Sequence, residues 1–438
     1  MGYLLVEVDK SSVDQLQYGY QALSSKTMCT WTVTAVVEYY NMRGRTVYGT
    51  AMDCSKAFDM VRWTELFKEL RKKGLSPIFL RLLLFTYFHQ YCDVRWNGSF
   101  SYRFPVCNGV RQGAVSSPIF FSVYVDKLIQ HLRLSGIGCT IGGIFVGIVV
   151  YADDIFLLCP SRAGLQSMVN ICEKFANKHN LQFSTNPDPN KSKTKGMIFT
   201  KNQRHRVNVP PVLLNGLPLP WVERMKHLGN TLECENNMVL DIGLKRAKFI
   251  GKIHSLNQEL HFCSPEVLIK LYNIYCCSFY GSNLFHLFSN TLDSLYRSWN
   301  NAVRIAFKLP NTTHTYLIED ISNSLHPKVM LSSRFVRFLK TCQSSHKQIV
   351  CLLSNLNHED KRTSVGKNVS GIEKSCKSSF KSLSPQIVKK VMKYRDIPEN
   401  EHWRTSLIFD LLEARQGNCE ILLEPEELLE VLNLACSS

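Results

Sequence analysis

Two adjacent carboxylates, Asp153 and Asp154, separate two apolar runs at residues 144–150 and 155–158. Apolar runs joined by a short polar turn predict a β-hairpin with the aspartates at its tip. Like charges side by side are unfavourable unless a cation neutralises them, and hard oxygen ligands of this kind suit Mg²⁺. The pair is therefore a candidate magnesium site, with a solvated Asp-Asp turn as the alternative.

Asp53 is the candidate for a third carboxylate ligand. It follows a β-type run at residues 46–52, and a carboxylate at the exit of a buried strand can meet the hairpin tip if the strands are neighbours. Taken alone, Asp53 would be an ordinary aspartate at the end of a strand. Asp59 is expected to cap the helix predicted over residues 63–72 rather than to bind metal.

A glycine-punctuated loop lies between Asp53 and the hairpin. It runs from residue 108 to Pro118 and leads into an apolar helix predicted over residues 119–132, whose first turn tolerates the proline. Its backbone amides and the side-chain amide of Gln112 could hold a base-paired nucleotide against the site. On its own the loop would be an ordinary start to a helix. It becomes evidence for a nucleotide site because it lies between Asp53 and the Asp153-Asp154 pair in the chain.

Cationic and hairpin segments follow the candidate site. Lys191, Lys193 and Lys195 form a charge run before a strand predicted at residues 196–199. Such a run usually marks a solvated face, but its position makes one of these lysines a candidate phosphate contact. A further hairpin is predicted over residues 212–229.

Two more local patterns are clear. Apolar and aromatic side chains at three- and four-residue spacing predict a helix over residues 27–40, with Ser24 or Ser25 as its N-cap. The Asn-Gly pair at residues 97–98 is a strong signal for a type I′ turn, which predicts a hairpin over residues 94–103. Both elements flank the β-type run that precedes the third carboxylate.

Composition and charge narrow the class of partner. The formal net charge of +16 over 438 residues points to a polyanion such as nucleic acid. No apolar run reaches the roughly 18–20 residues needed to span a bilayer, and no secretory signal is evident, so we expect an intracellular protein of the nucleus or cytoplasm with no membrane partner. The sixteen cysteines lack CxxC pairs and zinc-knuckle spacing, which indicates core thiols in a reduced compartment.

The order of these segments resembles the reverse transcriptase of non-LTR (LINE-type) retrotransposons, a class of transposable element. Five motifs carry the resemblance within residues 15–235, and five in the right order are specific where any one alone would be weak. They are the first palm motif at 51–59, the template grip at 110–113 with 117–118, the double-aspartate signature at 151–154, the next motif at 193–199 and the primer-grip hairpin at 227–229.

The resemblance implies an α+β fold of the right-hand polymerase type, with a ferredoxin-like palm. Partial fingers are expected at residues 1–45, a palm with a fingers insertion at 46–235 and an α-helical thumb at 236–310. A helical C-terminal extension is expected at 311–438. Within it, residues near 347–381 are rich in Ser, Lys and Asn and are predicted to form a basic linker.

By resemblance, the chain would be an RNA-directed DNA polymerase, a nucleotidyltransferase that adds dNTPs to a DNA primer on an RNA template. Asp53 and Asp153 would bind two Mg²⁺ ions, with Mn²⁺ as a substitute, and Asp154 would be the adjacent, less directly coordinated acid. All three are expected to be catalytic and to belong to the metal site. The net positive charge and the basic helical region suit an RNA–DNA hybrid gripped through its phosphates.

The resemblance also assigns roles outside the carboxylates. Phe58 would be the aromatic gate that rejects a 2′-hydroxyl, and Lys193 would contact the leaving pyrophosphate. The other residues expected to contact the nucleotide and template are Arg111, Gln112 and Gly113, and those expected in the primer grip are Leu228 and Gly229.

Some family features are not found in this sequence. The family's upstream fingers motifs are expected before the glycine-bearing turn that starts at Gln17, and this chain begins too late to hold them. Gln21 stands where the family has Arg after that turn. We therefore expect a chain truncated at the N-terminal fingers, with endonuclease activity supplied from elsewhere. The alternative is a catalytically impaired remnant or a domesticated nucleic-acid-binding protein that keeps the palm fold. A palm-fold nucleotide cyclase is disfavoured by residues 111–113 and the thumb-like segment.

Overall fold

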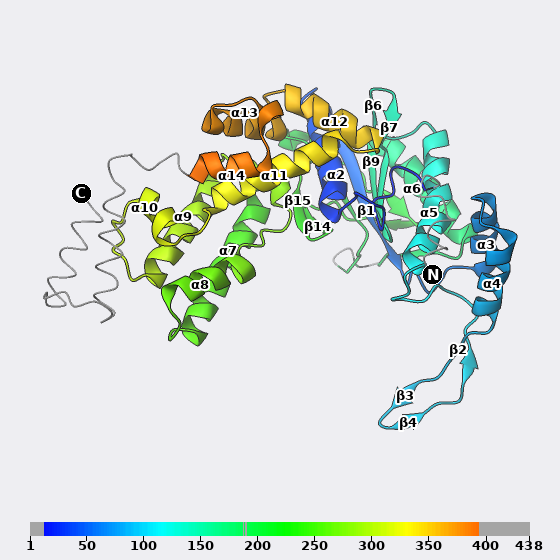
Figure 1. The fold of residues 1–438 in the computed structure, drawn as a ribbon. Coiled ribbons are helices and arrows are strands. Elements are labelled where there is room, and N and C mark those ends of the chain that lie inside the picture. The colour runs from blue at the N-terminus through cyan, green and yellow to red at the C-terminus, as the bar shows by residue number, and fades with distance from the viewer. Residues whose placement is uncertain (1–12, 187, 189–190, 394–438) are drawn as a thin grey trace, which may run out of the picture. The chain divides into compact units, whose positions relative to one another are not determined.

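The structure of the protein is a computed structural model that describes residues 13–186, 188 and 191–393 (Figure 1). The start of the predicted fingers and the end of the predicted C-terminal extension, residues 1–12 and 394–438, therefore lie outside the described residues.

The chain forms two compact units. Unit 1 comprises Met1–Asn237 and Ser344–Leu353, and unit 2 comprises Met238–Gln343 and Ser354–Ser438. Unit 1 thus includes a short second segment, which is separated from the first by more than a hundred residues of the chain. The division into fingers, palm, thumb and extension, with the boundaries given above, stays a prediction.

Unit 1 mixes helices and strands, most of which Figure 1 labels. Its helices are α2 (Lys26–Asn41), α3 (Trp63–Lys72), α4 (Pro77–Phe88), α5 (Ser117–Leu134) and α6 (Arg162–Lys178). Its longer strands are β1 (Val47–Ser55), β8 (Ile148–Tyr151), β9 (Asp154–Cys159), β11 (Lys195–Phe199), β14 (Arg224–His227) and β15 (Asn230–Glu233). Two-residue strands are β2 (Tyr91–Cys92), β3 (Arg95–Trp96), β4 (Ser99–Phe100), β5 (Phe104–Pro105), β6 (Thr140–Ile141), β7 (Ile144–Phe145), β10 (Gln182–Phe183), β12 (Leu213–Leu214) and β13 (Leu217–Pro218).

An antiparallel sheet lies at the centre of unit 1. Its strand order is β10-β1-β9-β8, and β11 also pairs with β1. Helices α2 and α6 pack against its strands. The five consecutive residues from Ile155 to Cys159 in β9 are all buried, and because successive strand residues face opposite sides, both faces of the sheet are covered there.

Local capping signals explain where several helices begin. Ser25 is the N-cap of α2, and its side chain accepts a hydrogen bond from the amide of Met28, which confirms one of the two predicted caps. The prediction that Asp59 caps α3 is wrong. The N-cap of α3 is Arg62, and Asp59 instead lies in the turn after β1, where its amide donates to the carbonyl of Lys56.

The predicted hairpins are present, with changed boundaries. Asn97 and Gly98 have φ of 46° and 83°, as a type I′ turn requires, and connect β3 to β4. The single hairpin predicted over residues 212–229 is in fact two hairpins, β12–β13 and β14–β15, with residues 228–229 forming the turn of the second. Likewise, residues 144–145 do not extend the double-aspartate hairpin but pair with β6.

Unit 2 is built from helices in its described part (Figure 1). They are α7 (Val239–Glu259), α8 (Pro265–Leu271), α9 (Asn290–Ala306), α10 (Thr315–Ile321), α11 (Pro327–Gln343), α13 (Ser364–Cys376) and α14 (Pro385–Lys393). Helix α12 (Gln348–Glu359) begins in unit 1 and ends in unit 2. Throughout both units, no described helix has the length and apolarity to cross a bilayer.

The prediction of a basic linker near residues 347–381 is wrong. This stretch forms helices α12 and α13, and α13 is capped by the side chain of Thr363. Its buried apolar residues recur at helical spacing, and they are Val365, Val369, Ile372 and Cys376. Composition alone suggested a solvated segment because the polar side chains outnumber this narrow buried stripe.

Asn368 offers a test of that correction. Its side chain lies in α13, is buried, accepts from the amide of Leu287 and donates to the carbonyl of Phe285, both at 2.8 Å. We predict that Asn368→Leu lowers the free energy of unfolding of unit 2 by about 2–4 kcal/mol, because it leaves two buried backbone groups unpaired. Thermal and denaturant unfolding of the full chain would measure this. The exposed Lys374→Gln on the same helix is the control, and equal stability of the two variants would contradict the packed helix.

Candidate active site

Two of the three predicted carboxylates lie directly opposite each other in the sheet. Asp53 in β1 pairs in register with Asp154 in β9. Directly opposed residues of an antiparallel pair point to the same face, so these two side chains are neighbours. The neighbouring-strand arrangement expected from the sequence is therefore present. Asp53 lies within its strand, since β1 continues to Ser55, rather than at the strand exit.

Asp153 lies in the turn beside them. Tyr151 in β8 pairs with Asp154 in β9, so Ala152 and Asp153 form a two-residue connection. Ala152 has φ of 58°, a left-handed conformation that costs an L-residue roughly 1–2 kcal/mol. The surrounding contacts must hold this strained turn in place, and the position of Asp153 depends on them.

Three aspartates, Asp53, Asp153 and Asp154, lie close enough for their charges to interact. Asp154 as a whole residue is exposed, but partial burial of its carboxyl and the nearby charges of Asp153 and Asp53 raise its pKa to about 6. Lys26 opposes this shift. Lys193 Nζ lies 3.9 Å from Asp53 Oδ2, but the two side chains are 72% and 38% exposed, so their attraction is weak.

The backbone of Asp53 is held by the segment that carries Lys193. The amide of Asp53 donates to Thr194 Oγ1 at 3.2 Å, and its carbonyl accepts from the amide of Ser184 at 2.8 Å. Thr194 is fully buried. Sequence reasoning noticed Thr194 only as part of a motif and missed this contact, because no local pattern indicates that the two segments meet.

The glycine-rich loop docks onto the chain just after β1. The amide of Gly109 donates to the carbonyl of Val61 at 2.9 Å, and Trp63 Nε1 donates to the carbonyl of Gly109 at 2.7 Å. Gly109 has φ of +86°, and a Cβ there would lie 2.9 Å from the carbonyl oxygen of Asp59. Glycine is therefore required by both conformation and space.

Two contacts place the side chains of Phe58 and Gln112 near this docked loop. The Phe58 ring stacks on Phe121 of α5 with centroids 4.9 Å apart and planes 19° apart. Gln112 Nε2 donates to Asp59 Oδ1 at 3.3 Å. The Phe58 ring is thus held from one side by α5, and the exposed residues at 111–113 project from the neighbouring loop.

The predicted primer-grip residues form a separate hairpin of the same unit. Leu228 and Gly229 have φ of 47° and 81° and make the tight turn between β14 and β15. The preceding His227 is buried with its ring 5.0 Å from that of Phe156 in β9, so the hairpin packs against a central strand. The role of this turn in gripping a primer stays a prediction.

The donor chemistry of the site fits a divalent cation. The three side chains offer hard carboxylate oxygens, and the nearby charges of Asp153 and Asp53, which add to burial in raising the pKa of Asp154, are ones that a cation would neutralise. Over residues 13–186, 188 and 191–393, no three His, Cys, Asp or Glu side chains are already gathered as a metal site.

A family model described as "Reverse transcriptase (RNA-dependent DNA polymerase)" matches residues 4–232, more than half of the chain. Among similar curated proteins are two from Drosophila melanogaster. The Pol polyprotein of the type-2 retrotransposable element R2DM is 30% identical over 138 residues, covering 32% of this chain and 13% of that protein. The putative 115 kDa protein of the type-1 element R1DM is 27% identical over 220 residues, covering 49% and 19%.

The chain belongs to the reverse transcriptase (RNA-dependent DNA polymerase) family. Its matched region is homologous to the polymerases of non-LTR retrotransposable elements, which confirms the resemblance and the α+β polymerase fold that it implied. The chain covers less than a fifth of the length of those two relatives. Among solved structures, apo telomerase from Candida tropicalis matches with a TM-score of 0.42 and 11% identity, covering 90% of this chain and 60% of that one.

The raised pKa of Asp154 predicts a pH-dependent stability difference. An aspartate with a folded-state pKa of about 6 and an unfolded value of about 4 favours folding below pH 4, and this contribution is lost as the pH rises through 6. In EDTA, Asp154→Asn should therefore have a higher Tm than the wild type at pH 7.5, and the difference should shrink as the pH falls from 6 to 4. Melting curves across this range measure it.

Two additions make that measurement decisive. Mg²⁺ at pH 7.5 should raise the wild-type Tm and leave that of Asp154→Asn less changed. The exposed Glu359→Gln serves as the control variant. A difference between Asp154→Asn and wild type that is the same at pH 4 and pH 7.5 would show that the carboxylates do not interact as described.

Proposed function

We propose that this chain is an RNA-directed DNA polymerase of a non-LTR retrotransposon, which extends a DNA primer with dNTPs on an RNA template. The observation that carries the proposal is the register of β1 and β9, which sets Asp53 beside Asp154 within the region matched to the family. The net charge of +16 suits a nucleic-acid substrate bound through its phosphates.

Asp53 and Asp153 are the residues proposed to hold two Mg²⁺ ions, with Mn²⁺ as a substitute, and Asp154 is the supporting acid. Bound ions would activate the primer 3′-hydroxyl and neutralise charge on the triphosphate. The proposal is supported by the raised pKa of Asp154, which comes first from burial of its carboxyl and then from the nearby charges of Asp153 and Asp53. It is supported further by the backbone contacts that fix Asp53 within β1.

The chain's own residues would orient the nucleotide. Lys193 lies beside Asp53 on an exposed surface, where its ammonium group can contact phosphate oxygens of the triphosphate and the leaving pyrophosphate. Phe58, held against Phe121, would present its ring to the sugar and exclude a 2′-hydroxyl. The exposed side chains of Arg111 and Gln112, with the flexible backbone of Gly113, would border the nucleotide and the template base.

The hairpin β14–β15 is proposed to grip the primer. Strand β14 alternates exposed and buried residues, so Arg224 and Lys226 are exposed while Met225 and His227 pack inward. Two exposed cations beside the tight turn at residues 228–229 suit a phosphate backbone. The second candidate function, a remnant that only binds nucleic acid, shares this basic surface, and only catalysis separates the two.

Primer extension tests the catalytic proposal. With an RNA template, a DNA primer, dNTPs and Mg²⁺, the full chain should extend the primer, and Asp53→Asn or Asp153→Asn should reduce the rate by at least about a hundredfold. Loss of a metal-binding carboxylate removes several kcal/mol of transition-state stabilisation, and each 1.4 kcal/mol is tenfold in rate. The exposed Glu359→Gln should keep the wild-type rate.

The remnant is distinguished by the same assay together with binding. Hybrid bound with unchanged affinity by wild type and Asp153→Asn, and extended by neither, would establish the binding-only function. Equal extension by wild type and Asp153→Asn would instead reject the assignment of the site.

Phe58 predicts sugar discrimination. Phe58→Ala should lower the preference for dNTPs over NTPs by about tenfold or more, because the ring stacked on Phe121 no longer fills the space of a 2′-hydroxyl. The ratio of kcat/KM for the two nucleotide types measures it. Phe262→Ala, which removes an exposed aromatic ring of unit 2, is the control. Should the ratio stay constant in Phe58→Ala, another residue must form the gate.

A further inference from the structure

A short segment at residues 14–18, here called the strap, lies along the free edge of the central sheet. Strand β8 is the last in the strand order, and the strap pairs with it in parallel at Gln17 and Val150. The amide of Tyr18 donates to the carbonyl of Val150 at 2.7 Å, and the amide of Val150 donates to the carbonyl of Leu16 at 2.9 Å. The strap therefore extends the sheet right beside the double-aspartate turn.

The side chain of Gln17 connects the strap to that turn. Its Oε1 accepts hydrogen bonds from the amides of Ala152 at 3.1 Å and Gly19 at 2.9 Å, and the residue is fully buried. A Cβ at Gly19 would lie only 2.5 Å from the nitrogen of Ala152, so the close approach depends on glycine. Gln17 thus holds the backbone of the strained residue that immediately precedes Asp153.

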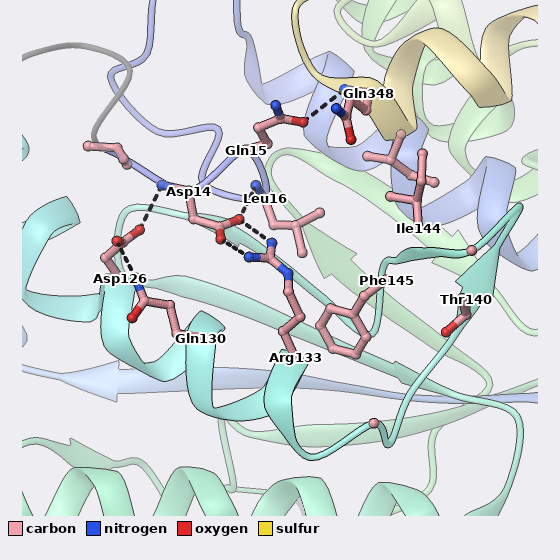
Figure 2. Close-up of a pocket in the computed structure, with 14 residues that line it drawn as sticks. Asp14, Gln15, Leu16, Asp126, Gln130, Arg133, Thr140, Ile144, Phe145 and Gln348 are labelled. Carbon is pink, nitrogen blue, oxygen red and sulfur yellow. Dashed lines mark hydrogen bonds and ion pairs between the residues drawn. The ribbon is translucent and has the colours of Figure 1, made fainter.

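The strap is in turn held by a lysine far away in the sequence. Lys347 Nζ donates to the carbonyls of Gln15 at 2.8 Å and Gln17 at 2.9 Å, and it lies 4.7 Å from the centroid of the Tyr18 ring. The next amide, that of Gln348, donates to Gln15 Oε1 at 3.0 Å. Figure 2 shows this last contact, where the start of α12 meets the strap.

The other end of the strap is fixed to α5. The amide of Asp14 donates to Asp126 Oδ1 at 2.7 Å, and Arg133 donates to Asp14 Oδ1 at 2.8 Å. Figure 2 shows both contacts at the edge of a cavity of about 670 Å³. Because both ends are anchored, the position of Gln17 is set by the strap as a whole.

Burying a lysine is costly, so its placement calls for a physical reason. Lys347 is 1% exposed, and burial lowers its pKa to about 8, although Asp14 and Cys29 oppose the shift. Its hydrogen bonds go to backbone carbonyls rather than to a carboxylate. An ammonium group offers three donors, which here meet two carbonyls and the face of an aromatic ring, so one side chain contacts three of the strap residues, Gln15, Gln17 and Tyr18.

We propose that Lys347 is a positioning residue for the polymerase site: it fixes the strap, and through the Gln17 side chain it sets the turn that carries Asp153. The proposal rests on the proposed function for its catalytic consequence. It also means that the region matched to the family, residues 4–232, does not hold its own active site unaided.

Hydrogen exchange tests the coupling without requiring activity. In the full chain, Lys347→Met should speed exchange of the amides of Ala152 and Gly19 by about tenfold or more, while the amides of α6 keep the wild-type rate as an internal reference. Lys201→Met, which removes an exposed lysine of the same unit, is the matched control. An unchanged turn, or equal acceleration in α6, would overturn the positioning role.

Kinetic measurements distinguish a positioning role of Lys347 from a role in stability alone. Lys347→Met should lower kcat for primer extension about ten- to a hundredfold, with the Kd for the RNA–DNA hybrid unchanged, because a small displacement of a catalytic group is costly. Gln17→Leu should give a similar loss, and the double variant should lose little more than either single one, since both act through one path. Additive losses would overturn the proposal.

A second variant and a readout that does not need activity cover the cases in which a protein does not fold or does not extend a primer. If Lys347→Met does not fold, Gln17→Leu leaves Lys347 in place and removes the acceptor of the Ala152 and Gly19 amides, and unchanged exchange at Ala152 in that variant would overturn the proposal. If the wild type extends no primer, the proposed function fails, while the exchange data still decide whether Lys347 holds the turn.

Discussion

The candidate site depends on one constraint, the register between strands β1 and β9. It sets the carboxylates of Asp53 and Asp154 side by side, an arrangement that is unfavourable without a cation. A slip of one residue would turn either side chain to the opposite face of the sheet. The continuous buried run from Ile155 to Cys159 resists such a slip, because it packs apolar side chains on both faces. Apolar packing of β9 thus keeps the two carboxylates adjacent in spite of their mutual repulsion.

Around this fixed pair, short segments far apart in the chain are tied to one another by backbone contacts. Gly109 locks the glycine-rich loop against the turn that follows Asp53, and Thr194 secures the amide of Asp53 itself. Phe58 lies in the turn after β1, and its ring stacks on Phe121 of α5. The backbone of this candidate site is thus held by the sheet and by contacts to α5, while the side chains of Arg111 and Lys193 are exposed.

The conformation of the double-aspartate turn depends on contacts from other segments of the chain. Ala152 adopts a left-handed conformation, and the contact that holds its amide comes from Gln17. The strap that presents Gln17 is held in turn by Lys347, which brings a segment beyond the family's polymerase region into unit 1. Strain at a site is sustained only where the surroundings over-determine it, and here those surroundings are assembled from three parts of the chain.

The sequence by itself determined the elements whose signals are local. Apolar spacing and a serine cap defined α2, the Asn-Gly pair defined the turn at residues 97–98, and two apolar runs defined the double-aspartate hairpin. It also pointed to Asp53, because a strand-borne carboxylate before the hairpin has few other uses once the motif order is recognised. The roles of the individual site residues stay predictions.

Only the tertiary structure decided what depends on distant contacts. The polar stretch near residues 347–381 became helical because a narrow buried stripe, hidden in its composition, meets the rest of unit 2. Thr194 and Gln17 gained roles that no local pattern announces. Lys347 contacts Gln15 across a separation of 332 residues. A one-dimensional pattern cannot distinguish a solvated lysine from one that three-dimensional packing buries against the segment beside the double-aspartate turn.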